Sequence, residues 1–142
     1  MKVVIDTNVL LVSLSSKSPY HIIFSKIITG ETTLVVSNEI ILEYEEIISN
    51  KMGTEASHNL ISFLKIAPNV ILKEPYFKWG LITSDIDDNK FVDLAICEDA
   101  EYLVTNDKSF KTLSNLQFPK VDVINARTYK MLLENKIIKT QF

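Results

Sequence analysis

Residues 3–11 read Val3-Val4-Ile5-Asp6-Thr7-Asn8-Val9-Leu10-Leu11, and this stretch decides the fold. Its three leading β-branched residues predict a buried strand over residues 2–6, because such side chains pack well on a pleated surface. Asp6 then stands at the carboxyl end of the strand, which is where open α/β sheets bind their ligands. A plainer interpretation is also open, in which Asp6 or Thr7 caps a helix that begins near Asn8.

The chain has the length and composition of one globular domain. Its 142 residues are enough to bury a core, and its contents of 46% hydrophobic and 23% charged residues are ordinary for a soluble protein. We expect one domain over residues 1–134 and a C-terminal tail over residues 135–142. No apolar run is long enough to cross a membrane, and no secretory signal is recognisable. The single cysteine, Cys97, excludes an internal disulfide and favours a cytoplasmic protein.

The charge of the chain limits its binding chemistry. A formal net charge of −3 argues against a broad basic surface for nucleic acid, but not against a local site. Arg127 is the only arginine, so forked arginine contacts to phosphate cannot dominate a nucleic-acid site. The sequence has only 3 glycines and no glycine-rich loop, which excludes P-loop and dinucleotide-binding sites.

Strand and helix signals alternate along the chain, which predicts a three-layer α/β/α fold with a central, mostly parallel sheet. The expected strands cover residues 2–6, 32–36, 69–72 at an edge, 101–104 and 121–124. The expected helices cover residues 8–15, 18–30, a segment capped by Ser37, and residues 54–66, 90–100, 109–115 and 126–134. Residues 73–82 are expected to be extended. The aromatic cluster around Trp79 in this segment is more typical of a core flap or a self-association surface than of a base-stacking platform.

Acidic residues recur where this fold would place a site. Asp6 and Asp107 each follow a predicted strand, so both face one crevice if the two strands are parallel neighbours. Asp88 stands at the start of a later helix, and Glu43 lies beside the apolar stripe of another. Four carboxylates that converge on one crevice repel each other strongly unless a cation is present. All-oxygen ligands select Mg²⁺ or Mn²⁺ over zinc.

The rest of the sequence is consistent with metal-assisted hydrolysis. His21 and His58 lack the spacing to another histidine or cysteine that a zinc site needs. No Ser–His or Cys–His arrangement suggests a side-chain nucleophile. A Mg²⁺ or Mn²⁺ ion held by carboxylates can instead activate water and neutralise the charge that develops on a phosphodiester during cleavage.

Four segments of the sequence resemble one known family. They are Ile5-Asp6-Thr7-Asn8-Val9-Leu10, Ser37-Asn38-Glu39-Ile40-Ile41-Leu42-Glu43, Asp85-Ile86-Asp87-Asp88-Asn89-Lys90-Phe91 and Ala100-Glu101-Tyr102-Leu103-Val104-Thr105-Asn106-Asp107. In this order they resemble the PIN-domain family of metal-dependent ribonucleases. Within it, the sequence is most similar to the VapC-like branch, the toxin components of toxin–antitoxin systems. The resemblance covers about residues 3–110.

The resemblance implies which residues form the site. By it, Asp6, Glu43, Asp88 and Asp107 form the acidic, catalytic metal site, with Mg²⁺ or Mn²⁺ as cofactor. Polar neighbours would orient these carboxylates, as metal ligands generally require. These neighbours are Thr7 or Asn8, together with Thr105.

Three other aspartates compete with Asp88 for the third acidic position. They are Asp85, Asp87 and Asp93. We choose Asp88 because it stands seven residues before Ala95, a small helix residue, which is the spacing that the family pattern suggests.

The resemblance also indicates partners. RNA would be the substrate, a cognate antitoxin protein would hold the toxin inactive, and a homodimer is expected. Lys90 and Lys108 flank the acidic site, where they either contact substrate phosphates or are ordinary solvated lysines.

Simpler roles remain open at this stage. Asp6, Asp88 and Asp107 can be helix caps, and Glu43 can be an exposed helix carboxylate. The alternative function is a non-catalytic PIN-like module that binds RNA or protein. A Mg²⁺-dependent phosphoaspartyl hydrolase fits less well, because it needs a second aspartate where Asn8 stands.

Overall fold

The computed structural model describes residues 1–141, and the side chains of residues 1–135. Five strands form one sheet in the order β3-β2-β1-β4-β5, and each neighbouring pair is parallel. The strands are β1 (Lys2–Ile5), β2 (Thr33–Val36), β3 (Val70–Leu72), β4 (Tyr102–Val104) and β5 (Val123–Ile124). The α-helices are α1 (Thr7–Ser13), α2 (His21–Ile28), α3 (Asn38–Met52), α4 (Thr54–Ile66), α5 (Asn89–Cys97) and α6 (Ala126–Gln141), and the 3-10 helices are η1 (Ile86–Asp88) and η2 (Lys108–Asn115).

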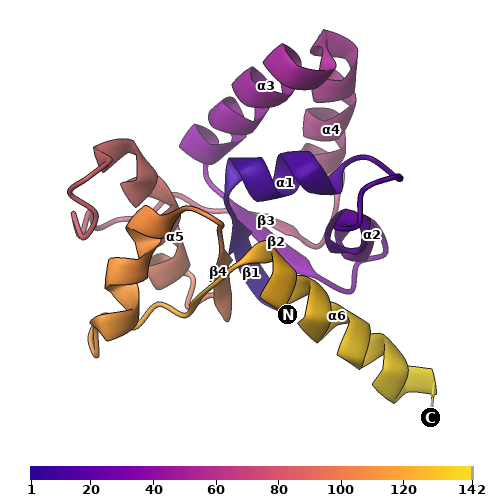
Figure 1. The fold of residues 1–142 in the computed structure, drawn as a ribbon. Helices are drawn as coiled ribbons and strands as arrows, with labels where there is room; N and C mark the ends of the chain where they lie inside the picture. The colour runs from indigo at the N-terminus through magenta and orange to yellow at the C-terminus, as the bar shows by residue number, and fades with distance from the viewer. Residues whose placement is uncertain (142) are drawn as a thin grey trace.

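Helices cover both faces of the sheet (Figure 1). Helix α5 lies on one side, whereas α1, α2 and α6 lie on the other. Helices α3 and α4 pack against each other as a hairpin that turns at Gly53. The φ of Gly53 is 98°, a backbone conformation that side chains disfavour. The predicted three-layer α/β/α fold is therefore confirmed, with a sheet that is parallel throughout.

The order of the strands reverses between β1 and β4. From β1 the chain passes to β2 and then to β3 on one side, while β4 and β5 lie on the other side. In open α/β sheets, ligands bind at such a switch point, in the crevice outside the carboxyl ends of the strands. Asp6 directly follows β1, and Asp107 comes shortly after β4. Both carboxylates therefore stand at the crevice.

The central strands are buried on both faces. Residues 3–5 and 34–36 are fully buried, which explains why they are continuous apolar runs without alternation. Tyr44 of α3 packs into this core, and its hydroxyl donates to the carbonyl oxygen of Ile5 at 2.5 Å. This bond fixes α3 against the end of β1, next to Asp6.

Two helix bounds differ clearly from the prediction. The sequence predicts a helix start at Ser18, but α2 begins at His21. The Ser18 hydroxyl accepts from the backbone N–H of Tyr20 at 3.1 Å, so Ser18 closes a turn ahead of the helix. The last helix was expected to end at Glu134, but α6 continues because residues 135–141 contain no glycine or proline to stop it.

The remaining predicted elements are present with bounds that shift by a few residues, and the expected helix over residues 109–115 is the 3-10 helix η2. Within the described part of the chain, no helix has the length and apolarity needed to cross a membrane. The division into a domain over residues 1–134 and a tail over residues 135–142 stays a prediction, and Phe142 lies outside the described residues.

Candidate metal site

The backbone of Asp6 makes the first hydrogen bonds of α1, whereas its carboxylate bonds to a residue outside this helix. Its N–H donates to the carbonyl of Val104 at 2.9 Å, and its carbonyl accepts from Val9 and Leu10 at 3.0 and 3.1 Å. Across the described residues, the carboxylate makes no capping hydrogen bond to α1. Its Oδ2 atom instead accepts from the hydroxyl of Thr105 at 2.7 Å. The interpretation of the Asp6 side chain as a helix cap is therefore wrong.

A series of hydrogen bonds joins Asp6 to two further carboxylates. The Thr105 hydroxyl that donates to Asp6 also accepts from the backbone N–H of Asp107 at 3.0 Å. Asp107 Oδ1 accepts from the N–H of Ser109 at 2.9 Å, and the Ser109 hydroxyl donates to Asp88 Oδ2 at 3.3 Å. We call Asp6, Thr105, Asp107, Ser109 and Asp88 the carboxylate framework. Asp107 also caps η2 with the same oxygen, so its capping bond is itself part of this framework.

The carboxylate framework carries uncompensated negative charge. Burial raises the pKa of Asp6, and the charges of Glu43 and Asp107 raise it further, against local hydrogen bonds. Burial, together with the charges of neighbouring aspartates, raises the pKa of Asp88 to about 6. Among the side chains of residues 1–135, no lysine or arginine forms an ion pair with Asp6, Asp88 or Asp107. A cation at this place would relieve the repulsion.

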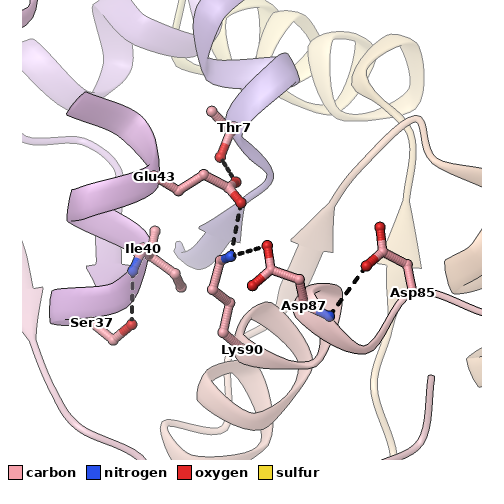
Figure 2. Close-up of polar contacts among 7 residues, drawn as sticks. All are labelled: Thr7, Ser37, Ile40, Glu43, Asp85, Asp87 and Lys90. Carbon is pink, nitrogen blue, oxygen red and sulfur yellow. Dashed lines mark hydrogen bonds and ion pairs between the residues drawn. The ribbon is translucent and has the colours of Figure 1, made fainter. Parts of the chain in front are cut away.

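Glu43 belongs to a second polar cluster (Figure 2). Its Oε2 atom accepts from the hydroxyl of Thr7, and its Oε1 atom lies 2.8 Å from the Lys90 ammonium nitrogen. The same nitrogen lies 2.7 Å from Asp87 Oδ2. Burial of the ammonium lowers the pKa of Lys90, but the hydrogen bonds to Asp87 and Glu43 outweigh burial and leave it raised. We call Thr7, Glu43, Lys90 and Asp87 the lysine cluster.

The three aspartates that compete with Asp88 have other partners. Asp85 caps η1 by accepting from the N–H of Asp87 at 3.2 Å (Figure 2). The Asp87 carboxylate pairs with the lysine just described. Asp93 is buried in α5, where it accepts from the N–H of Trp79 at 3.0 Å. Of these four aspartates, Asp88 is the one in the carboxylate framework.

The polar neighbours expected from the sequence divide between the two clusters. Thr105 and Thr7 each donate to one carboxylate, as described above. Asn8 is exposed at the start of α1 and has no hydrogen bond among the described side chains. Lys108 is exposed and directly follows Asp107.

Two residues of the site were missed in the sequence. Ser109 bridges Asp107 and Asp88, and the spacing Asp-x-Ser, which is typical of a side-chain-capped turn, is the signal that points to it. Burial raises the pKa of the Tyr44 hydroxyl well above its ordinary value. The apolar stripe places Tyr44 in the core, but nothing in the sequence indicates its bond to Ile5.

Comparison with known proteins identifies the family. The PIN domain matches residues 2–109, which include all four segments singled out in the sequence. The chain belongs to the PIN-domain family. PIN domains are generally nucleases, and the family generally uses divalent metal ions.

Solved structures show the same fold. One such structure is VapBC2 from Rickettsia felis, crystallised with a DNA fragment from its promoter. A chain of it is 17% identical to this PIN domain, with a TM-score of 0.60. The match covers 88% of this chain and 98% of that one. The PIN domain of human SMG5 is 13% identical with a TM-score of 0.52, and the match covers 93% of this chain and 98% of that one. No curated protein matches the sequence.

The donor set of this PIN domain fits a hard divalent ion. Asp6, Asp88 and Asp107 offer only oxygen atoms, which is the chemistry that Mg²⁺ and Mn²⁺ prefer. As the described side chains stand, no three aspartate, glutamate, histidine or cysteine residues lie close enough together to share one ion. Asp107 is exposed and Asp88 half-buried, so both have the freedom to close around a cation.

A cavity of about 530 Å³ opens beside the lysine cluster. Its walls come from the start of α3, from residues 75–80 and from the first turns of α5. Asp87 and Lys90 line it, as does the buried carboxylate of Asp93. Its volume is in the range of small-ligand sites.

Proposed function

We propose that the chain is an endoribonuclease that depends on Mg²⁺ or Mn²⁺. The observation that carries the proposal is the carboxylate framework, in which Asp6, Asp107 and Asp88 share one run of hydrogen bonds at the switch point of the sheet. Carboxylates without a paired cation, at a crevice that typically binds ligands, are suited to hold a divalent ion. Membership in a family of nucleases supports phosphodiester hydrolysis as the reaction.

Asp6, Asp88 and Asp107 would hold the ion. When bound, such an ion lowers the pKa of a water molecule and neutralises the charge that develops on the phosphodiester. Thr105 donates to Oδ2 of Asp6, and this bond orients the carboxylate. Ser109 donates to one oxygen of Asp88 in the same way. Carboxylates that are already oriented need less rearrangement when an ion binds.

Glu43 would position the attacking water. Its two oxygens have one partner each, Thr7 and Lys90, and a carboxylate oxygen can accept a second hydrogen bond. A water molecule that donates to Glu43 is aligned for attack on phosphorus, and its proton can pass to this carboxylate.

RNA would lie across the carboxylate framework and enter the cavity that opens beside the lysine cluster. Lys108 is exposed next to Asp107, and Lys78 is exposed at the cavity, so both can contact substrate phosphates. The ammonium of Lys90 is already paired with Glu43 and Asp87, which leaves it less suited to this role.

We further propose that this nuclease is the toxin of a toxin–antitoxin pair, acts in the cytoplasm and forms a homodimer. The sequence resemblance and the similarity of fold to a chain of VapBC2 support a cognate antitoxin as partner. Expression of the wild-type chain should then arrest bacterial growth, and co-expression of the protein encoded beside it should restore growth. Normal growth with a chain that cleaves RNA in vitro would contradict the toxin role and leave the nuclease proposal standing.

The nuclease proposal is tested with purified protein, RNA and Mn²⁺. We expect cleavage that EDTA abolishes and that Asp6→Asn abolishes, because both remove ion binding. Asp122→Asn, at an exposed aspartate beside β5, is the matched control and should cleave normally. Cleavage by the Asp6→Asn variant, or in EDTA, would overturn the metal mechanism. A folded wild-type chain that binds RNA without cleaving it would favour the alternative of a non-catalytic module.

A further inference from the structure

The Lys90 ammonium occupies a place that resembles a cation site. Its nitrogen lies 2.8 Å from Glu43 Oε1 and 2.7 Å from Asp87 Oδ2, so two carboxylates from different elements hold it (Figure 2). The side chain of Lys90 is only 9% exposed, whereas that of Glu43 is 23% exposed. An ammonium group with so little access to water is stable only where anions replace its hydration.

We propose that Lys90 is the built-in cation of a second acidic site, formed by Glu43 and Asp87, and that it limits the metal centre to one divalent ion. In this account Lys90 is a positioning residue that keeps Glu43 in place. Its ammonium does not pair with RNA phosphates, and it leaves no room for a second ion. The inference rests on the proposed metal-dependent function, and it adds how many ions the site takes and which residue sets that number.

The tether of Lys90 explains why a second ion does not replace it. Lys90 stands three residues after Asp87, at the start of α5, and α5 packs against α3, which carries Glu43, so its ammonium stays within reach of both carboxylates. A group on so short a tether competes at an effective concentration of ~1 mM or more. A free ion would also have to shed part of its hydration shell, which Mg²⁺ does reluctantly.

The partners of Glu43 fix its carboxylate on both sides. Thr7 of α1 donates to one oxygen, and Lys90 of α5 pairs with the other. Since α1 and α5 lie on opposite sides of the sheet, these two contacts hold Glu43 across the crevice (Figure 1). Loss of the ammonium would leave Glu43 and Asp87 as two facing carboxylates with no cation between them. This is the arrangement that recruits a divalent ion.

The test counts Mn²⁺ ions bound to the full chain without RNA, by electron paramagnetic resonance of the free ion. The wild-type chain should bind about one Mn²⁺, and Lys90→Gln about two, because the neutral side chain frees an all-oxygen pair. Lys90→Arg keeps the charge and should bind about one. Lys108→Gln removes an exposed lysine outside the lysine cluster and should also bind about one.

Each result decides a different point. A wild-type chain that binds two ions, or a folded Lys90→Gln chain that binds only one, would overturn the role of Lys90 and leave the nuclease proposal intact. A wild-type chain that binds no Mn²⁺ would contradict the metal-dependent function itself. Circular dichroism checks that each variant is folded.

A second variant covers the case in which Lys90→Gln does not fold. Glu43→Gln keeps the side-chain shape and the lysine. If Glu43 pairs with Lys90 and does not bind the ion, this variant should bind its single Mn²⁺ within ~3-fold of the wild-type affinity. If Glu43 is a ligand of that ion, the affinity should fall by ~10-fold or more, and the proposal is then wrong.

Discussion

Asp87 and Asp88 are adjacent in the sequence, yet their carboxylates lie in opposite electrostatic environments. The hydrogen bond from Lys90 lowers the pKa of Asp87, whereas burial and neighbouring aspartates raise the pKa of Asp88 to about 6. The two belong to the 3-10 helix η1, in which successive side chains point about 120° apart. One therefore reaches the lysine cluster and the other the carboxylate framework.

This difference separates two kinds of acidic site. In the lysine cluster the chain supplies the cation itself, and this ammonium offsets one of the two negative charges. In the carboxylate framework the chain supplies orienting hydroxyl groups and leaves the negative charge unbalanced. A site that is to bind an ion must keep its charge available, at a cost to the stability of the metal-free protein.

The largest expected effect is the difference in RNA cleavage rate between variants of the two adjacent aspartates. Asp88→Asn should lower the rate of RNA cleavage by ~100-fold or more, since loss of even an outer partner of a metal ligand costs about 10–100-fold. Asp87→Asn should stay within ~3-fold, because Asp87 is an exposed partner of one lysine. Single-turnover cleavage in Mn²⁺ measures both rates. Equal losses in the two variants would contradict the assignment of Asp88.

The two threonines offer a second comparison, because each donates a hydroxyl hydrogen bond to one carboxylate. Thr105→Val should weaken Mn²⁺ binding by ~10–100-fold, since Asp6 loses its orienting partner. Thr105→Ser keeps the hydroxyl and should bind normally. Thr7→Val should change Mn²⁺ affinity by less than ~3-fold, because its partner Glu43 lies in the other cluster. Isothermal titration calorimetry measures these affinities. Similar losses of Mn²⁺ affinity in Thr7→Val and Thr105→Val would contradict the assignment of the ion to the carboxylate framework alone.

The lysine cluster should matter for stability more than the exposed charges do. Lys90→Gln should lower the free energy of unfolding of the metal-free chain by about 1–2 kcal/mol, because it leaves the half-buried Glu43 without its cation. Lys108→Gln should change it by less than ~0.5 kcal/mol. Urea denaturation in EDTA measures both values. An unchanged stability in Lys90→Gln would show that the ion pairs contribute nothing.

The smallest expected effect concerns pH. A carboxyl group with a raised pKa in the folded state binds its proton more tightly there than in the unfolded chain. The stability that it contributes therefore increases as the pH falls from about 6 toward its ordinary value of 3.8. The metal-free wild type should be more stable at pH 5 than at pH 7. For the half-buried Asp88 we expect ~1 kcal/mol or less after solvent screening.

Asp88→Asn is the control for this effect, because its amide does not titrate. Its stability in EDTA should vary less between pH 5 and pH 7 than that of the wild type. Asp6 and Asp93, whose pKa values burial also raises, contribute to what remains. A wild-type chain that loses stability between pH 7 and pH 5 would contradict the sign of these shifts.

Much of the fold was readable in the sequence because buried parallel strands leave a strong signal. The apolar runs at residues 3–5 and 34–36 are buried on both faces and stand where the strands were expected. Helix ends were less predictable, because local side-chain bonds decide them. Ser18 carries a typical cap signal, but its hydroxyl closes a turn instead.

The acidic residues of the candidate site could be singled out in the sequence, but their division into two clusters could not. Asp6 and Asp107 follow strands, so topology brings them together once the sheet order is known. The separate partners of Asp87 and Asp88 depend on the direction of side chains in a single turn. The pairing of Lys90 with Glu43 depends on how α3 approaches α5. Neither relation leaves a periodic pattern in the sequence.

The most direct test of the account is anomalous diffraction from a crystal of the wild-type chain soaked in Mn²⁺. We predict one Mn²⁺ ion bound by carboxylate oxygens of Asp6, Asp88 and Asp107, with Lys90 still between Glu43 and Asp87. An ion between Glu43 and Asp87 with Lys90 displaced, or no ion at the carboxylate framework, would contradict the account.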